Sequence, residues 1–137
     1  MDQSLVKEQL DQLTEFFFQL FTNKEGAIPQ VNLIHELFIP SGTIICNTGS
    51  TPIIYTLEEF IKPRVIILTD GTLVDFEEKE ISEQTEIFGQ IAHRFSVYEK
   101  SGVRDGQYFQ MKGSKSTQFI HTPDGWKICS LIWDDEK

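Results

Sequence analysis

The stretch GQIAHRFSVYEKSG, residues 89–102, brings four side chains with catalytic chemistry close together: His93, Arg94, Tyr98 and Glu99. An imidazole can transfer protons near neutral pH, and a carboxylate or guanidinium beside it can orient it. The β-branched and aromatic residues between them favour an extended strand. Successive side chains of a strand point to opposite faces, so His93 and Arg94 must point apart. The sequence therefore divides this cluster between the two faces of a sheet.

His93 is the residue of this stretch with the best claim to catalysis. On the inner face of a curved sheet, with Phe95 in the apolar lining, its imidazole could act as a general acid or base. An acidic side chain such as Asp75 or Glu99 could orient the imidazole. The alternative is a core histidine whose ring nitrogens are hydrogen-bonded to a backbone carbonyl or a neighbouring side chain. We expect Arg94 and Tyr98 on the outer face, paired with an acidic neighbouring strand or with a second subunit.

The composition favours one globular domain that spans residues 1–137. The chain has 39% hydrophobic residues and 11 phenylalanines, enough for one core without disulfides or a metal. The two cysteines, Cys46 and Cys129, lie far apart in apolar surroundings, as expected of reduced, buried thiols. The N-terminal residues lack the basic and then apolar order of a secretory signal. We therefore expect a cytoplasmic protein.

Several classes of partner are not expected. The formal net charge is −9, and none of the 12 basic residues forms a block, which argues against nucleic acid. No run of about 18 apolar residues occurs, so we expect no membrane span. The acidic run 75–86 matches no Ca²⁺ loop, and we interpret it as a solvated strand face. Metal and phosphate-binding motifs are also missing, so we expect no metal and no cofactor.

Hydrophobic periodicity predicts helices first and a sheet afterwards. The spacing changes from a helical period to alternation near residue 72, and short glycine-containing joins such as GVRDG and TPDG indicate antiparallel hairpins. The predicted helices cover about 4–21, 30–39 and 57–69, a short strand covers 43–47, and long strands cover about 72–82, 85–101, 107–122 and 126–135. This order predicts an α+β fold in which a curved antiparallel sheet wraps around the N-terminal helices.

The last predicted strand is apolar on both faces. Trp126, Ile128 and Ile132 would lie on one face, and Cys129, Leu131 and Trp133 on the other. Helices can cover only one of these faces, so the other needs another partner. We expect a homodimer through the outer face of the sheet, because two-fold homodimers are the commonest soluble assembly.

The order of elements resembles the nuclear transport factor 2 (NTF2)-like superfamily, which includes the SnoaL-like polyketide cyclases, ketosteroid isomerase and scytalone dehydratase. The resemblance spans nearly the whole chain and depends most on LFIPSGTIICNTG, IAHRFSVYE and DGWKI. It implies a cone-shaped α+β barrel with a cystatin-like fold, whose wide end commonly holds a pocket between helices and sheet. It does not imply one activity, because the superfamily contains enzymes, binding modules and assembly domains.

Matching individual residues to ketosteroid isomerase does not support isomerase chemistry. The comparison puts Cys46 where that family has its aspartate general base, and a buried thiol is a poor proton shuttle at neutral pH. That family also implies a tyrosine oxyanion donor in the first helix. The segment 4–21 contains only phenylalanines as aromatic residues.

Our first hypothesis is a small-molecule binding protein with an apolar pocket between helices and sheet. One alternative is a cofactor-independent isomerase, cyclase or dehydratase that uses His93 as its proton-transfer residue; another is a dimeric interaction domain without a ligand. An enzyme needs at least two titratable groups aimed at one point of a cavity, whereas an interaction domain would have a filled interior. The predicted ligand-binding residues are Phe17, Cys46, Tyr55, Phe60, Phe95, Gln118 and Trp133.

Overall fold

The computed structural model of the chain describes all 137 residues. Its elements, in order, are α1 (Gln3–Gln19), η1 (Lys24–Gly26), η2 (Val31–Leu33), α2 (Ile34–Leu37), β1 (Phe38–Cys46), β2 (Ile53–Tyr55), α3 (Leu57–Thr69), β3 (Leu73–Phe88), β4 (Ile91–Arg104), β5 (Gln107–Thr122) and β6 (Gly125–Asp135). No helix among them is long and apolar enough to span a membrane.

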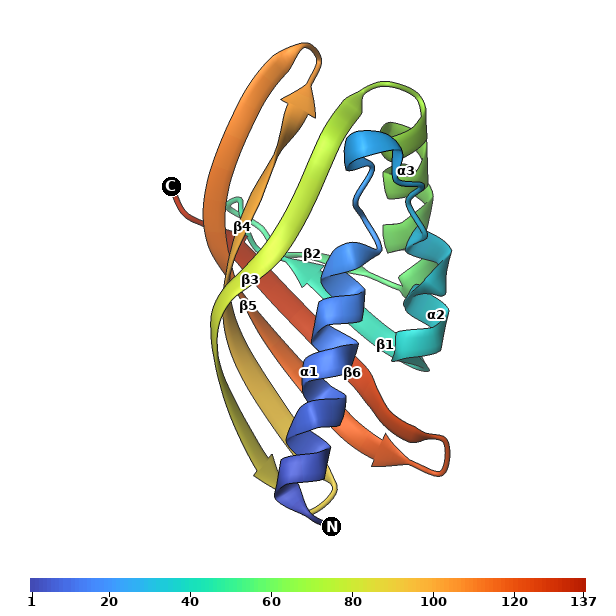
Figure 1. Cartoon of the computed structure of the whole chain (residues 1–137), viewed down its shortest axis with the longest axis vertical. Coiled ribbons are helices and arrows are strands. Elements are labelled where there is room, and N and C mark those ends of the chain that lie inside the picture. Colours follow the sequence, from blue (N-terminus) through green and yellow to red (C-terminus); the bar gives the residue numbers. More distant parts are fainter.

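The six strands form one curved sheet in the order β2-β1-β6-β5-β4-β3. Strands β3 to β6 pair antiparallel through successive hairpins, whereas β1 lies parallel to β6. The sheet is therefore mixed and does not close into a complete barrel. Figure 1 shows α1 lying along one side of the sheet, with α2 and α3 near the β1 edge. The predicted α+β class and the curved sheet are confirmed.

Helix α1 packs its apolar stripe onto the inner face of the sheet. The Asp2 side chain caps its first turn by accepting a hydrogen bond from the Ser4 amide at 2.8 Å. Val6, Leu10 and Phe17 recur at helical spacing and are almost completely buried. They belong to one continuous core, which also receives side chains from α2, α3 and every long strand. The core therefore lies between α1 and the concave face of the sheet.

Helix α3 begins at a capping box and closes the wide end of the sheet. The Glu59 amide donates to Thr56 Oγ1 at 3.2 Å, and the Thr56 amide donates to Glu59 Oε1 at 2.9 Å. Leu57, Phe60 and Ile61 are buried against the core. Because the cap fixes the residue at which α3 begins, it also fixes which side chains of the helix face the sheet.

The region of the second predicted helix differs from the expected range 30–39. A 3-10 turn, η2, leads into the four-residue helix α2, and Phe38 already begins β1. The segment Ile53–Tyr55, which no predicted element covered, pairs with β1 as strand β2. Helical spacing alone cannot separate a short helix from an adjoining buried strand, because both bury apolar residues over a few positions.

The first long hairpin turns later than the sequence indicated. Strand β3 continues past Glu83 to Phe88, and a two-residue turn at Gly89 and Gln90 leads into β4. Gly89 has φ 56°, a conformation that glycine adopts without strain. The predicted strands 72–82 and 85–101 placed the join near Glu83, but in the structure these residues belong to one continuous strand.

A bulge in β6 changes the faces assigned to the last strand. The pairing with β5 shifts between Gln118 and Phe119, which leaves Cys129 without an opposite residue. As a result Trp126, Ile128, Leu131 and Trp133 all point inward. The prediction that both faces of this strand are strongly apolar was wrong, because one extra residue reverses the alternation that follows it.

Candidate functional site

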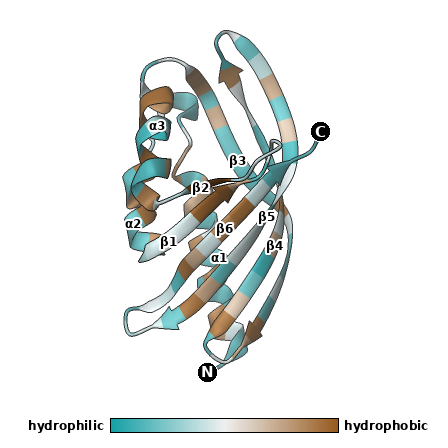
Figure 2. Ribbon diagram, turned by 180° about the vertical axis from the view of Figure 1, so that it is seen from behind, coloured by the Kyte–Doolittle hydropathy of each residue, from teal (hydrophilic) through white to brown (hydrophobic).

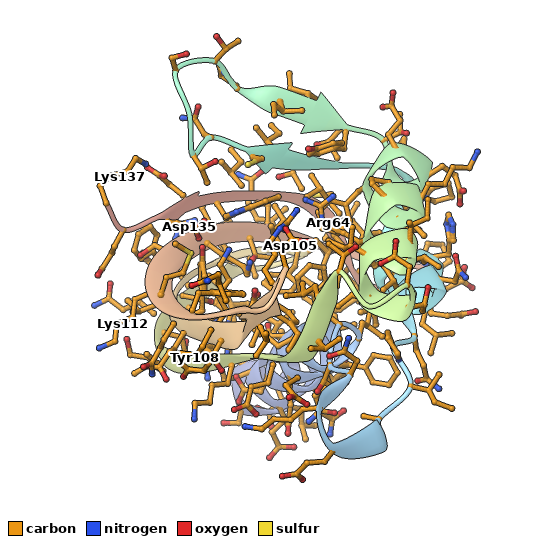
Figure 3. The ribbon with its side chains drawn as sticks, turned by 90° about the horizontal axis from the view of Figure 1, so that it is seen from above. Arg64, Asp105, Tyr108, Lys112, Asp135 and Lys137 are labelled. Carbon is orange, nitrogen blue, oxygen red and sulfur yellow. The ribbon has the colours of Figure 1, made fainter.

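A cavity of about 580 Å³ lies between α3 and the wide end of the sheet, beside the β4–β5 hairpin. Figure 3, seen from above, shows Arg64 inside the ring of elements around this space, with Lys112 and Lys137 outside it. Twelve of the eighteen lining residues are apolar: Phe17, Phe21, Tyr55, Phe60, Ile67, Leu68, Leu73, Phe76, Phe109, Met111, Leu131 and Trp133. A cavity of this size and lining is typical of a small-molecule site.

Four of the seven predicted ligand-binding residues line this cavity: Phe17, Tyr55, Phe60 and Trp133. The ring of Phe60 lies edge-on to Tyr55 at 5.8 Å and to Trp133 at 5.9 Å between centroids. This geometry is favourable for aromatic pairs. It joins α3 to β2 and β6, so one wall of the cavity is a connected aromatic cluster.

The other three predicted binding residues lie away from the cavity. Phe95 is 54% exposed on the outer face of β4. Gln118 is also exposed, and its Oε1 accepts a hydrogen bond from Ser130 Oγ at 2.9 Å. Cys46 Sγ lies 3.3 Å from Thr48 Oγ1 and does not line the cavity. The structure therefore does not bring these three residues to the site.

His93 also lies on the outer face of β4, with 59% of its side chain exposed. Its Nε2 is 3.1 Å from Glu86 Oε1 on β3. The inner face of β4 carries Arg94 and Tyr98, which are 3% and 0% exposed. Both face assignments were reversed in the sequence-based interpretation. Phe95 is apolar and shares a strand face with His93, so the sequence favoured that face for the core. The fold buries the opposite face instead, where acidic side chains pair with the charge of Arg94.

The buried Arg94 guanidinium is held by acidic groups from two elements. Its Nε and Nη2 donate to the two carboxylate oxygens of Glu80 at 3.0 and 2.6 Å, and Nη1 donates to Asp11 on α1 at 2.6 Å. Burial opposes the charge, yet these hydrogen bonds raise the pKa of Arg94 above its ordinary value. The network fixes α1 against β3 and β4.

The floor of the cavity contains a buried ion pair between β5 and β3, the two strands on either side of β4. Lys115 Nζ lies 3.0 Å from Glu78 Oε1, and both side chains are more than nine-tenths buried. The ammonium also lies 4.2 Å from the centroid of the Tyr98 ring. Burial lowers the pKa of Lys115 in spite of the opposite charge of Glu78.

A second pair connects the cavity to the C-terminal end of β6. Lys100 Nζ lies 3.1 Å from Asp135, and the Tyr98 hydroxyl donates to the same carboxylate. Burial, followed by this hydrogen bond to Asp135, raises the pKa of Tyr98 well above its usual value. The polar groups of the floor therefore already have partners.

Arg64 on α3 is the site residue that the sequence interpretation missed. Its guanidinium carbon lies 3.7 Å from the Phe60 ring centroid, 5.2 Å from Tyr55 and 5.6 Å from Trp133. The signal was present in the sequence. Arg64 lies four residues after Phe60 and four before Leu68, so a charged residue interrupts an apolar helical stripe.

Comparison with known proteins gives structural matches only. No family model matches the sequence, and no curated protein matches it. An NTF2-like superfamily protein from Salmonella enterica serovar Typhimurium is similar, with a TM-score of 0.78 at 15% identity over 98% of this chain and 94% of that one. An NTF2-like protein of Streptomyces avermitilis, provisionally called a dehydratase, has a TM-score of 0.71 at 14% identity over 94% and 95% of the two chains.

A third similar structure comes from Exiguobacterium sibiricum and is provisionally named a Ca/calmodulin-dependent kinase II association domain. Its TM-score is 0.72 at 12% identity, over 100% of this chain and 95% of that one. Other matching chains are described as having a cystatin-like fold. At these identities the likeness concerns backbone architecture, because fold does not determine function. The resemblance expected from the sequence is confirmed at this level: the chain has the cystatin-like α+β fold of the NTF2-like superfamily.

Proposed function

We propose that the protein binds a small, largely apolar molecule in the cavity between α3 and the sheet. The observation that carries this proposal is a cavity of about 580 Å³ whose lining is two-thirds apolar, with a few polar groups at defined places. Cavities with this combination bury most of a small ligand and orient it through the few polar contacts. The aromatic wall of Tyr55, Phe60 and Trp133 offers ring faces and edges to a flat ligand.

The geometry favours this binding role over the two alternatives. An interaction domain without a ligand would have a filled interior, whereas space remains between α3 and the sheet. A proton-transfer enzyme based on His93 would need that imidazole to reach the ligand, but it lies on the opposite face of β4. Both cysteines are free thiols, which is compatible with the expected cytoplasmic location.

A matched pair of isoleucines on α3 tests the cavity. Ile67 lines it, whereas the preceding residue, Ile66, is 58% exposed outside it. Nile red, a neutral fluorescent probe, should bind the wild-type protein and the Ile66→Trp variant alike. Ile67→Trp should fill part of the space and weaken binding, with Ile67→Phe as a milder variant if the larger one unfolds. Equal binding by both tryptophan variants, or no binding by the wild type, would contradict the proposal.

We also propose that two copies of the chain pair through the outer face of the sheet. One row across this face runs Phe95, Ser116, Ile132, Ile45 and Ile54 in neighbouring strands. Phe95, Ile132 and Ile54 are all exposed, and Figure 2 shows this side of the sheet with hydrophobic bands among hydrophilic ones. An exposed apolar row flanked by polar residues is typical of a protein interface.

A further inference from the structure

The cavity has a charge opposite in sign to that of the chain. The protein has a formal net charge of −9, yet its cavity lining holds four cationic side chains and a single carboxylate, Glu78. Lys115 is neutralised by Glu78, and Lys100 is neutralised by Asp135. The lining therefore retains two cations without a carboxylate partner, Arg64 and Arg104. Of these, Arg104 lies exposed at the end of β4, whereas Arg64 belongs to the aromatic wall.

Arg64 has unused hydrogen-bonding capacity that faces the cavity. A guanidinium carries five N–H donors, and Arg64 uses one nitrogen, Nη1, which donates to the Phe60 carbonyl oxygen at 3.2 Å. No side-chain nitrogen or oxygen that is sealed from solvent lacks a hydrogen-bond partner. The other nitrogens of Arg64 are therefore accessible to solvent, and because Arg64 lines the cavity, a ligand bound there can accept hydrogen bonds from them.

The environment of Arg64 also makes its positive charge costly. Phe60, Tyr55 and Trp133 surround the guanidinium within 6 Å of their ring centroids. These rings replace water around the charge, and burial lowers the pKa of Arg64. Ring faces compensate a cation only in part, since cation–π interactions are weaker than a charge-assisted hydrogen bond. An anion at this place would supply the missing compensation.

We propose that the natural ligand is an apolar molecule with one carboxylate, and that this carboxylate pairs with Arg64. The inference rests on the proposed binding function and specifies the chemical class of the ligand. A planar, forked guanidinium fits the two oxygens of a carboxylate. The apolar body of the ligand would lie along the aromatic wall and against Ile67 and Met111, which also line the cavity. Arg64 is then the residue that selects an acid over a neutral molecule of the same shape.

Two isosteric competitors test this inference. Cinnamate and cinnamamide have nearly the same size and shape, but only cinnamate carries a negative charge. Each is titrated against Nile red bound to the wild-type protein, and the concentration that displaces half of the probe is compared. One charge-assisted hydrogen bond contributes about 1.5–3 kcal/mol, so cinnamate should displace the probe at a concentration about tenfold lower or more.

Variants of α3 assign the preference to Arg64. Arg64→Met should abolish the preference for cinnamate while Nile red still binds. Arg64→Lys keeps the positive charge but lacks the planar, forked guanidinium, so it should retain part of the preference for cinnamate. Lys62→Met is the matched control, because Lys62 is exposed on the same helix and its replacement changes the net charge equally. This control should keep the full preference.

The outcomes separate this inference from the proposed function. Equal displacement by cinnamate and cinnamamide on the wild type, or an unchanged preference in Arg64→Met, would contradict the proposal that the ligand's carboxylate pairs with Arg64. The cavity would then remain a proposed site for neutral apolar ligands. No binding of Nile red to the wild type would contradict the binding function itself. If Arg64→Met fails to fold, the wild-type comparison and Arg64→Lys still decide the question.

Discussion

Arg94 and Glu80 form a two-pronged ion pair inside the sheet, with Nε to Oε2 at 3.0 Å and Nη2 to Oε1 at 2.6 Å. Ser96 Oγ donates to the same carboxylate at 2.6 Å. Asp11 on α1 accepts a further hydrogen bond from Arg94. The buried positive charge on β4 is thus paired with carboxylates on β3 and on α1, a helix distant in sequence. The network explains why a polar face of β4 can be the inner one.

Removing Arg94 should destabilise the fold. Arg94→Met leaves Glu80 partly buried beside Ser96 without its counter-charge, which should cost about 3 kcal/mol of unfolding free energy. Urea denaturation followed by circular dichroism measures this change. Arg104→Met, at the exposed end of the same strand, removes the same charge and should have little effect. Equal stabilities of the two variants would show that the network contributes nothing.

Tyr98 should make stability depend on alkaline pH. Its pKa is raised in the folded protein above the unfolded value of 10.0, so the folded state keeps the proton that the unfolded chain releases. The stabilisation is therefore complete below pH 10 and is lost as pH rises beyond it, by up to about 1.4 kcal/mol for each pH unit. Comparing wild type with Tyr98→Phe in urea at each pH isolates this contribution from that of Lys115.

The ionisation of Tyr98 also has a direct optical readout. Tyrosinate absorbs in the near ultraviolet, so an alkaline titration of the native protein should show one tyrosine fewer than the same protein in urea. Tyr98→Phe should remove that difference. If native wild type and native Tyr98→Phe differ by one titrating tyrosine near pH 10, the hydroxyl is not protected as the structure indicates.

Gly113 should not tolerate a methyl group. A Cβ at this position would overlap the Tyr98 hydroxyl and lie 2.6 Å from the Asp134 carbonyl oxygen. Gly113→Ala must therefore displace Tyr98 or part β5 from β6, at a cost of about 2 kcal/mol. Thermal unfolding measures the loss. Gly49→Ala is the control, since nothing lies within 4 Å of its Cβ position, and a similar loss in both variants would contradict the steric explanation.

The proposed dimer should depend on the outer apolar row. Phe95→Lys places a charge in the middle of this row and should convert a dimer to a monomer, because an unpaired charge in an interface is costly. Light scattering coupled to size-exclusion chromatography measures the mass. Ile66→Lys changes an isoleucine that is similarly exposed on α3 and should leave the dimer intact. A wild-type mass of 15.8 kDa would exclude the dimer at the concentration measured.

Some parts of the site could be found from sequence, and others could not. Phe17 and Phe60 belong to helical apolar stripes, so their inward direction follows from spacing. His93 and Phe95 were assigned to the wrong face because alternation identifies two faces without saying which is buried. Arg64 had a visible signal, a charge within an apolar stripe. The place of Arg64 in the cavity wall depends on contact with Trp133, which lies 69 positions further along the chain.

The sequence by itself determined the change from helices to sheet, the cap of α3 at Thr56 and the presence of hairpins, because these depend on spacing over a few residues. Only the tertiary structure decided which face of β4 is internal. Arg94 can be buried only where β3 brings Glu80 and α1 brings Asp11. The cavity likewise exists only because α3 packs over a curved sheet and space remains between them, and no local sequence pattern sets the separation of the helix from the sheet.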